Sequence, residues 1–257
     1  MNIKELYEYL CADIPQALSC PWDNDGLMAA REMSAEVKKV LVSLDATEAA
    51  IGFASANGFD VLLTHHPMIF KGMKHVTPLT LEGRRVIAAL SGGVAVLSFH
   101  TRLDAVKGGV NDALCAALGL TPDGVFGDEE APSLGRLVTL SEKMTLRELA
   151  AHVKKSLGAP YVKVISGGDG EQKVQKIAVC GGDGKDFTYP ALAAGAEVLI
   201  TGSSGYNMAE DAAECGIATI EAGHYYTEAP VCKVLAEKIK AAGISCAVYN
   251  SCKEHVL

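Results

Sequence analysis

Three short motifs hold the side chains best suited to chemistry in this sequence. They are the pair His65-His66 before Pro67, His100 with Asp104 four residues on, and His224 with Glu228 at the same spacing. Imidazole is the commonest protein metal ligand, and carboxylate oxygens join it in many mixed sites. Four histidines and two carboxylates exceed the needs of a single four-coordinate ion. We therefore expect two ions, which a carboxylate such as Glu228 can bridge.

The donor set also narrows the choice of metal and reaction. Nitrogen donors with a minority of anionic oxygen and no sulfur suit Zn, Fe, Mn or Co better than Ca or Mg. Two such ions roughly 3.5–4 Å apart can activate water and hold a charged oxygen. This chemistry predicts two divalent metal ions as cofactors of a hydrolase.

Each motif alone also has an ordinary explanation. A histidine pair lies at a surface or core edge more often than in a metal site, and the spacing of His224 and Glu228 also suits a solvated helix start. Arg102 offers Asp104 a simple ion pair. Metal binding is favoured because all three motifs follow expected strands, and sites on open α/β sheets lie where strands end.

The elements that must position these motifs alternate along the chain. Apolar periodicity predicts strands at 37–45, 60–64, 94–99, 134–140, 160–165, 174–180, 197–201 and 216–221, and helices at 2–12, 46–57, 81–91, 110–118, 145–157 and 188–195. This order indicates an α/β protein with mixed sheets flanked by helices. Pro67 blocks a ladder hydrogen bond and ends its strand, so that His65 and His66 can share one site.

A change of composition predicts where the chain divides. Residues 121–132 concentrate proline, glycine and acids with little apolar periodicity. Such segments are typical of domain boundaries. We therefore expect one α/β domain over 1–125, with the first two motifs, and a second over 126–257, with the third.

The two halves also resemble each other. Placing 37–42 over 174–179 puts 60–64 over 197–201 without a gap. Placing the return strand 93–96 over 216–219, with a one-residue adjustment, puts His100 over His224. Internal duplication explains this match, although any two α/β units share some likeness. Because binding sites favour the interface of two domains, we expect the metal site in the cleft between them.

Composition excludes several classes of protein. The 257 residues are 49% hydrophobic and 21% charged, as in a well-packed globular protein, and the net charge of -8 argues against nucleic-acid binding. No stretch reaches the roughly 18 apolar residues of a membrane span. The eight cysteines include no CxxC pair and suit buried free thiols, so we expect a reduced, cytoplasmic protein.

Two glycine-rich segments suggest other chemistry only weakly. The GGDGK stretch at 181–185 follows a strand as a phosphate-binding loop would, but it lacks the P-loop spacing, and a plain turn explains it. The TGSSGY stretch at 201–206 has two serines where a nucleophile elbow centres one. Serine hydrolysis is therefore not expected.

The motifs together resemble the Nif-three-like family, whose members are often named GTP cyclohydrolase I type 2. The similarity spans nearly the whole chain in the same motif order, and the chain is similar to the short type that lacks an inserted domain. The matching segments are WDNDGL (22–27), THHPMIF (64–70), HTRLDAVKGGVND (100–112), ITGSSGY (200–206) and AGHYYTE (222–228).

This resemblance implies two related α/β domains, a toroidal homohexamer built as a trimer of dimers, and a dinuclear metal centre facing the internal cavity. The implied metal ligands are His65, His66, Asp104, His224 and Glu228, with Glu228 bridging. His100 is then a nearby residue that supports a ligand or faces the substrate, and we expect this catalytic imidazole to relay protons. The implied reaction is GTP ring opening, and another nucleotide or phosphoester substrate is equally compatible.

Three positions differ from the usual family pattern, namely Arg102, Ser203 and Asn207. None of them is an implied ligand, so they bear on the substrate and the cavity lining. Two non-enzymatic hypotheses remain beside the hydrolase. One is a ring-shaped scaffold or metal-handling protein that binds metal without turnover, and the other is a purely structural protein without stoichiometric metal.

Overall fold

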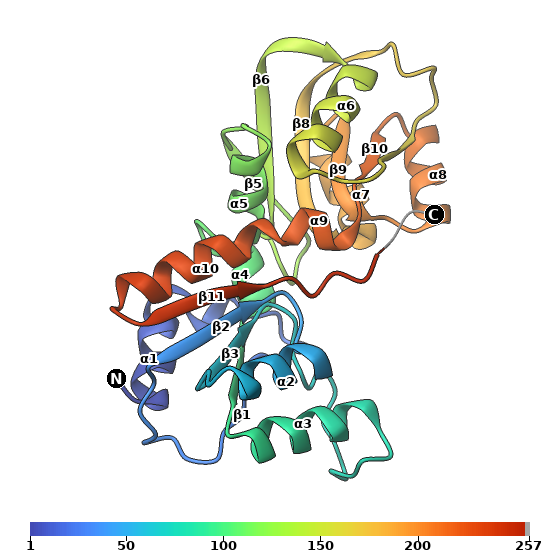
Figure 1. Cartoon of the computed structure of the whole chain (residues 1–257). Helices are drawn as coiled ribbons and strands as arrows, with labels where there is room; N and C mark the ends of the chain where they lie inside the picture. Colours follow the sequence, from blue (N-terminus) through green and yellow to red (C-terminus); the bar gives the residue numbers. More distant parts are fainter. Residues whose placement is uncertain (255–257) are drawn as a thin grey trace. The chain divides into compact units, whose positions relative to one another are not determined.

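The computed structural model describes residues 1–254, which form two compact units (Figure 1). Within the described residues, unit 1 comprises Met1–Leu103 and the chain from Cys232 to residue 254, and unit 2 comprises Asp104–Val231. Unit 1 is therefore built from two separate stretches of chain. This grouping differs from the sequence-based division after residue 125, because no composition change marks the return of the chain at Cys232.

Unit 1 contains a five-stranded sheet in the order β1-β4-β3-β2-β11. The last four of these strands are parallel, and β1 is antiparallel to β4. Its helices and strands are α1 (Ile3–Asp13), η1 (Gln16–Leu18), β1 (Gly26–Ala29), β2 (Lys39–Ser43), α2 (Glu48–Ala56), β3 (Val61–Thr64), α3 (Leu81–Gly92), β4 (Ala95–Ser98) and β11 (Ser245–Tyr249). Two further helices, α4 (Thr101–Ala105) and α10 (Pro230–Ala241), contain the points where the chain passes between the units.

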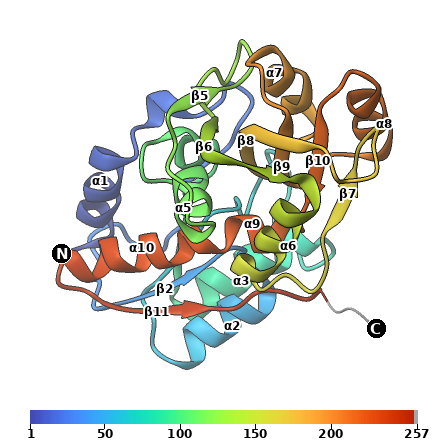
Figure 2. The ribbon, with the colours of Figure 1, turned by 90° about the horizontal axis from the view of Figure 1, so that it is seen from above.

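Helices cover both faces of this sheet, because its central strands are apolar on both sides (Figure 2). Leu41, Leu62 and Val96 pack against α2 and α3 in one core cluster. Val40 and Leu63 point to the opposite face and are also fully buried. On that side α1 and α10 are linked, since the Tyr9 hydroxyl donates to the Lys238 carbonyl at 3.3 Å.

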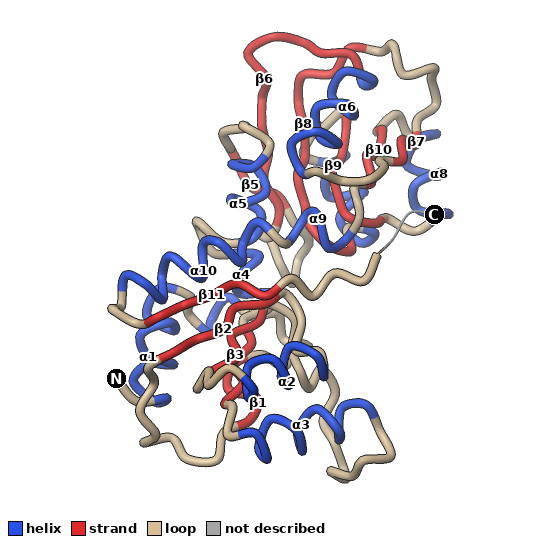
Figure 3. Tube along the Cα trace, in the orientation of Figure 1, coloured by secondary structure: helices blue, strands red, loops and turns tan. Residues whose placement is uncertain are grey.

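Unit 2 contains a six-stranded mixed sheet in the order β5-β6-β8-β9-β10-β7 (Figure 3). Only β8, β9 and β10 are parallel to one another. The elements are α5 (Val110–Ala117), β5 (Gly124–Phe126), β6 (Gly135–Thr145), α6 (Leu146–Leu157), β7 (Lys163–Ile165), β8 (Lys173–Asp183), η2 (Lys185–Phe187), α7 (Thr188–Ala193), β9 (Val198–Ser203), α8 (Tyr206–Glu214), β10 (Ala218–Glu221) and α9 (His224–Glu228). Its core joins α5 and α6 to the sheet through Leu114, Leu149, Ile177 and Ile200.

The predicted α/β class with two mixed sheets and flanking helices is confirmed, and each predicted strand and helix has a counterpart at nearly the same residues. Several elements were not predicted, among them β1, β5, α8 and β11. All four are short or lack a clear apolar period. Within residues 1–254, no helix combines the length and apolarity that crossing a bilayer requires.

Candidate metal centre

Unit 1 gathers three histidines where two neighbouring parallel strands end. His65 and His66 directly follow β3, and His100 lies just beyond β4. Their ring centroids are 4.9 to 5.9 Å apart, and each ring offers one nitrogen within 4.8 Å of the other two. Within unit 1 these three rings can therefore hold a metal ion.

Each of these rings is oriented through its Nδ1 atom. His65 Nδ1 contacts the Phe99 carbonyl at 2.9 Å, and His66 Nδ1 contacts Asp45 Oδ1 at 2.7 Å. His100 Nδ1 contacts Asp23 Oδ1 at 2.9 Å. Because carbonyl and carboxylate oxygens only accept, each Nδ1 carries a proton, and the lone pair of the neutral ring lies on Nε2. Metal-ligating histidines characteristically have this arrangement.

The support of His66 extends to the far end of the chain. The Ser251 hydroxyl donates to Asp45 Oδ2 at 2.8 Å, while Asp45 Oδ1 accepts from His66. Both residues belong to unit 1, although 206 residues separate them in sequence. The segment after β11 therefore helps to fix a candidate ligand.

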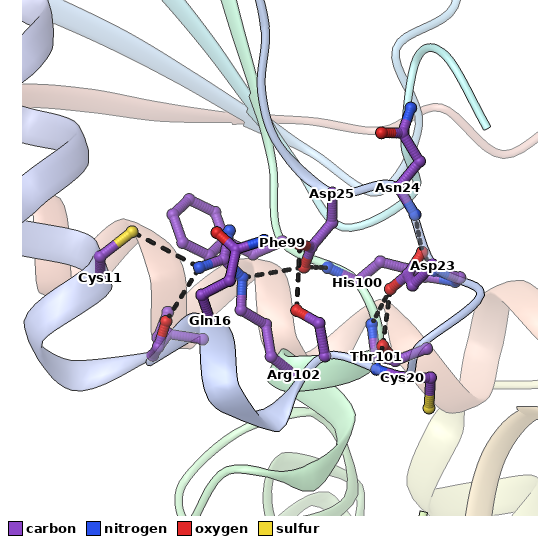
Figure 4. Close-up of polar contacts among 12 residues, drawn as sticks. Cys11, Gln16, Cys20, Asp23, Asn24, Asp25, Phe99, His100, Thr101 and Arg102 are labelled. Carbon is purple, nitrogen blue, oxygen red and sulfur yellow. Dashed lines mark hydrogen bonds and ion pairs between the residues drawn. The ribbon is translucent and has the colours of Figure 1, made fainter. Parts of the chain in front are cut away.

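The loop before β1 holds His100 through two aspartates (Figure 4). Asp23 accepts from His100 Nδ1 and also from the backbone N–H and hydroxyl of Thr101, at 3.0 and 2.6 Å. Asp25 Oδ2 accepts from the His100 backbone N–H at 3.1 Å. Burial alone would raise the pKa of Asp23, but the bonds from His100 and Thr101 outweigh it and lower the pKa to about 2. Asp23 is therefore a permanent anion beside His100.

Arg102 also belongs to this network. Its Nε donates to Asp25 Oδ2 at 2.8 Å, and both side chains are almost completely buried. The guanidinium also stacks over the Phe99 ring at 4.3 Å. The ion pair that Arg102 forms within unit 1 is thus with Asp25, whereas the sequence suggested Asp104 as its partner.

Unit 2 brings together the other three candidate residues. His224 begins α9 and Glu228 ends it, so one helical turn places His224 Nε2 3.0 Å from Glu228 Oε2. An oxygen of Asp104 lies within 4.8 Å of an oxygen of Glu228, and both carboxylates are buried. Two buried carboxylates this close remain ionised together only when positive charge or hydrogen-bond donors compensate them. A divalent ion fits this donor set, and Glu228 is close to both of the other donors.

Two glycines give α9 the space that this arrangement needs. A Cβ at Gly182 would lie 2.1 Å from Glu228 Oε1 and 3.3 Å from His224 Nε2. A Cβ at Gly202 would lie 2.7 Å from the His224 Cα. Only glycine permits so close an approach of helix and strand ends. The GGDGK stretch, expected to be a plain turn, thus ends β8 beside a candidate ligand.

Sequence reasoning identified the candidate donors but not the residues that support them. Asp23, Asp45 and Gly182 make close contacts with them. The sequence did contain a signal for two of these supporting residues. Asp45 directly follows an apolar strand, and Asp23 lies in the polar loop around the only tryptophan. The serine pair has a structural role, as the Ser204 hydroxyl donates to Glu221 Oε1 at 2.6 Å.

Comparison with known proteins places the chain among relatives of the same fold. The family model described as Duf34/NIF3 (NGG1p interacting factor 3) matches residues 1–254. Proteins named GTP cyclohydrolase 1 type 2 homolog from Clostridium acetobutylicum and Clostridium perfringens are each 34% identical, with 94% and 93% of this chain covered and 91% and 92% of theirs. The crystal structure of Staphylococcus aureus protein SA1388 matches with a TM-score of 0.88 at 24% identity, covering 100% of this chain and 99% of that one.

Proposed function

The chain belongs to the Duf34/NIF3 family, and we propose that it is a metal-dependent hydrolase with a dinuclear centre. The proposed ligands are His65, His66, Asp104, His224 and Glu228. The observation that carries the proposal is the donor geometry within each unit. Unit 1 presents imidazoles with fixed Nδ1 atoms, and unit 2 presents two buried carboxylates beside an imidazole.

The donor set suits two ions of Zn, Fe, Mn or Co, with Glu228 as the bridging ligand. When bound, such a pair supplies Lewis acidity and lowers the pKa of water. The buried position of Glu228, close to both His224 and Asp104, supports the bridging role. The proposed ligands belong to both units.

His100 is the proposed proton relay. Its Nδ1 proton is held by the anionic Asp23, which leaves Nε2 to accept a proton from a reacting group. Asp25 fixes the backbone of His100, and Arg102 fixes Asp25, so the ring has a defined position. The same ring also belongs to the three-histidine group, which gives it an alternative role as a ligand.

A nucleotide or another phosphoester is the proposed substrate. The relatives named GTP cyclohydrolase 1 type 2 homolog support GTP ring opening as one candidate reaction. The resemblance of the motifs to that family further supports a toroidal homohexamer. A second candidate function is a ring-shaped metal-binding scaffold without turnover, which the same donor set supports.

Elemental analysis of untagged protein tests the metal centre first. We expect about two ions per chain, and protein without stoichiometric metal would contradict both the hydrolase and the scaffold.

Glu228→Gln keeps the shape of the side chain but removes its charge, so we expect it to lower the metal content while circular dichroism stays unchanged. Retention of both ions in this variant would rule out bridging.

Turnover separates the hydrolase from the scaffold. Wild-type protein loaded with each metal is to be assayed against nucleotides and phosphoesters, and the hydrolase predicts release of product from at least one. The His66→Ala, Glu228→Gln double variant is the control and should be inactive. Metal binding without turnover would support the scaffold.

A further inference from the structure

An exposed aromatic pair lies beside the histidines of unit 1. Trp22 is 55% exposed and Phe70 is 45% exposed, and their ring centroids are 6.2 Å apart. The His100 ring lies 6.5 Å from Trp22 and 6.1 Å from Phe70. Exposed aromatic rings adjacent to polar catalytic groups are typical of surfaces that stack against planar ligands.

The loop that presents Trp22 is firmly fixed by the three residues that follow it. Asp23 and Asp25 accept hydrogen bonds from His100 and its neighbours, as described above. Asn24 Nδ2 donates to the Ile69 carbonyl at 2.5 Å, which ties this loop to the residue before Phe70. The two rings are therefore held in place before any ligand arrives, and binding need not order them.

A cavity of about 660 Å³ adjoins this aromatic pair at Phe70. Phe70 itself lines it, together with Lys71, Lys74, Arg85 and, as an acidic residue, Glu82. Arg85 Nε is buried and has no hydrogen-bond partner within residues 1–254. Three cationic side chains in one cavity stand out in a chain of net charge -8. The cavity is thus suited to an anion.

We propose that unit 1 binds a planar heteroaromatic ring that carries a phosphate group. The ring stacks on Trp22 and Phe70, and the phosphate enters the cavity beside Lys71, Lys74 and Arg85. This subsite deepens the proposed function, on which its catalytic meaning rests, because it places a nucleotide-like substrate next to His100. None of the five subsite residues is a proposed metal ligand.

The chain offers a specific reporter, since Trp22 is its only tryptophan. Guanosine 5′-monophosphate, titrated into the full-length protein, should quench the tryptophan emission saturably. Guanosine should quench it with weaker affinity, because it lacks the phosphate. Ribose 5-phosphate should leave the emission unchanged but compete with guanosine 5′-monophosphate.

Variants separate the two parts of the subsite. Phe70→Leu should weaken binding of both guanosine compounds by roughly tenfold, the effect of losing one stacking contact. The Lys71→Gln, Lys74→Gln double variant should weaken guanosine 5′-monophosphate alone. Lys38→Gln is the matched control, since Lys38 is an exposed lysine of unit 1 paired with Glu36, and it should change neither.

The titration is to be run on metal-stripped and metal-loaded protein, which distinguishes the subsite from the metal centre. Saturable quenching in metal-stripped protein would support the subsite independently of the metal centre, and quenching by a protein that takes up no metal on loading would support the subsite and reject the proposed hydrolase. Two bound ions without any quenching would overturn the subsite and leave the metal centre standing. Emission that changes with protein concentration but not with nucleotide would also overturn it, since a second copy would then cover Trp22.

Discussion

Each unit contains three neighbouring parallel strands, β2, β3 and β4 in unit 1 and β8, β9 and β10 in unit 2, but the units differ where these strands end. In unit 1 the ladder pairs Val40 with Val61, and in unit 2 it pairs Ile177 with Val198 at the matching positions. Before β3, Asp60 Oδ2 accepts from the backbone N–H groups of Lys38 and Lys39, both at 2.8 Å. Glu197 Oε2 accepts from Gln175 and Lys176 in the same way, at 2.6 and 2.9 Å. These repeated bonds support the internal duplication predicted from the sequence.

At the carboxyl ends of the same strands, the two units carry different residues at corresponding positions. By this register, Asp45 corresponds to Gly182 and His65 to Gly202. In unit 1, His65 at this position is a candidate metal ligand, and Asp45 accepts a hydrogen bond from the candidate ligand His66. Unit 2 has glycines there, and α9 approaches closely enough to present His224 and Glu228. A single framework therefore supplies donors from a strand end in one unit and from a helix in the other.

The largest expected effect comes from the buried arginine of each unit. Asp25→Asn leaves the fully buried Arg102 without its charged partner and should cost about 3–5 kcal/mol of unfolding free energy. Asp112→Asn acts on Arg136, whose partner carboxylate is 22% exposed, and should cost less. Urea unfolding measures both, with the exposed pair of Asp13 and Lys238 as control through Asp13→Asn. Equal costs in the two units would contradict the role given to burial.

The next largest effect is expected at Gly202, where the absence of a side chain lets α9 approach the end of β9. A Cβ there would meet the Gly182 carbonyl oxygen at 2.5 Å, and backbone atoms cannot move aside. Gly202→Ala should therefore cost about 1–3 kcal/mol or more in urea unfolding, although His65 occupies the corresponding position in unit 1. Gly52→Ala is the control, because nothing lies within 4 Å of that position in α2. A neutral Gly202→Ala would show that α9 can retreat without cost.

Metal affinity should fall when either of the corresponding residues Asp45 and Gly182 is changed. Gly182→Ala would push Glu228 aside, and Asp45→Ala would remove the acceptor that orients His66. Each change should weaken metal binding roughly 10- to 100-fold, as loss of a supporting contact commonly does. Competition with a chromophoric chelator measures the affinity. If only one variant loses affinity, only that unit contributes to the site.

The smallest effect on unfolding free energy is expected at Asp60 and Glu197, the carboxylates that accept equivalent backbone hydrogen bonds in the two units. Asp60→Asn and Glu197→Gln keep an acceptor oxygen but remove the charge, so each should cost about 1 kcal/mol. Hydrogen bonds from the backbone, first that of Lys176, lower the pKa of Glu197 below its ordinary value. The advantage of wild type over Glu197→Gln should therefore be complete above roughly pH 4.3 and shrink as the pH falls further. Urea unfolding at pH 7 and pH 3 checks this, and a pH-independent difference would contradict it.

Apolar periodicity was enough to predict the α/β class and the central strands, because buried parallel strands form uninterrupted apolar runs. It did not reveal β11, whose residues are largely exposed, or its pairing with β2 across most of the chain. Local patterns hold no information on such long-range pairings. The pairing is what makes unit 1 discontinuous.

For the candidate site, the sequence likewise predicted only part, namely the candidate donors and not the residues that contact them. Residue type and position after a strand were enough to predict His65, His66 and Glu228 as candidate donors. The contacts of Asp23 and Gly182 depend on loops that meet only in the folded protein. Their roles could therefore not be derived from spacing.

The discontinuity of unit 1 sets an order of events during synthesis. Asp45 and Ser251 are 206 residues apart, a distance that a ribosome covers in about 10–40 s at ~5–20 residues per second. For that time β2 has an unpaired edge with the apolar residues Val40, Leu41 and Val42, which invites pairing with other chains. Asp45, and through it His66, receives its last support only when Ser251 emerges. The nascent protein therefore cannot assemble this support of His66 before nearly the whole chain has been made.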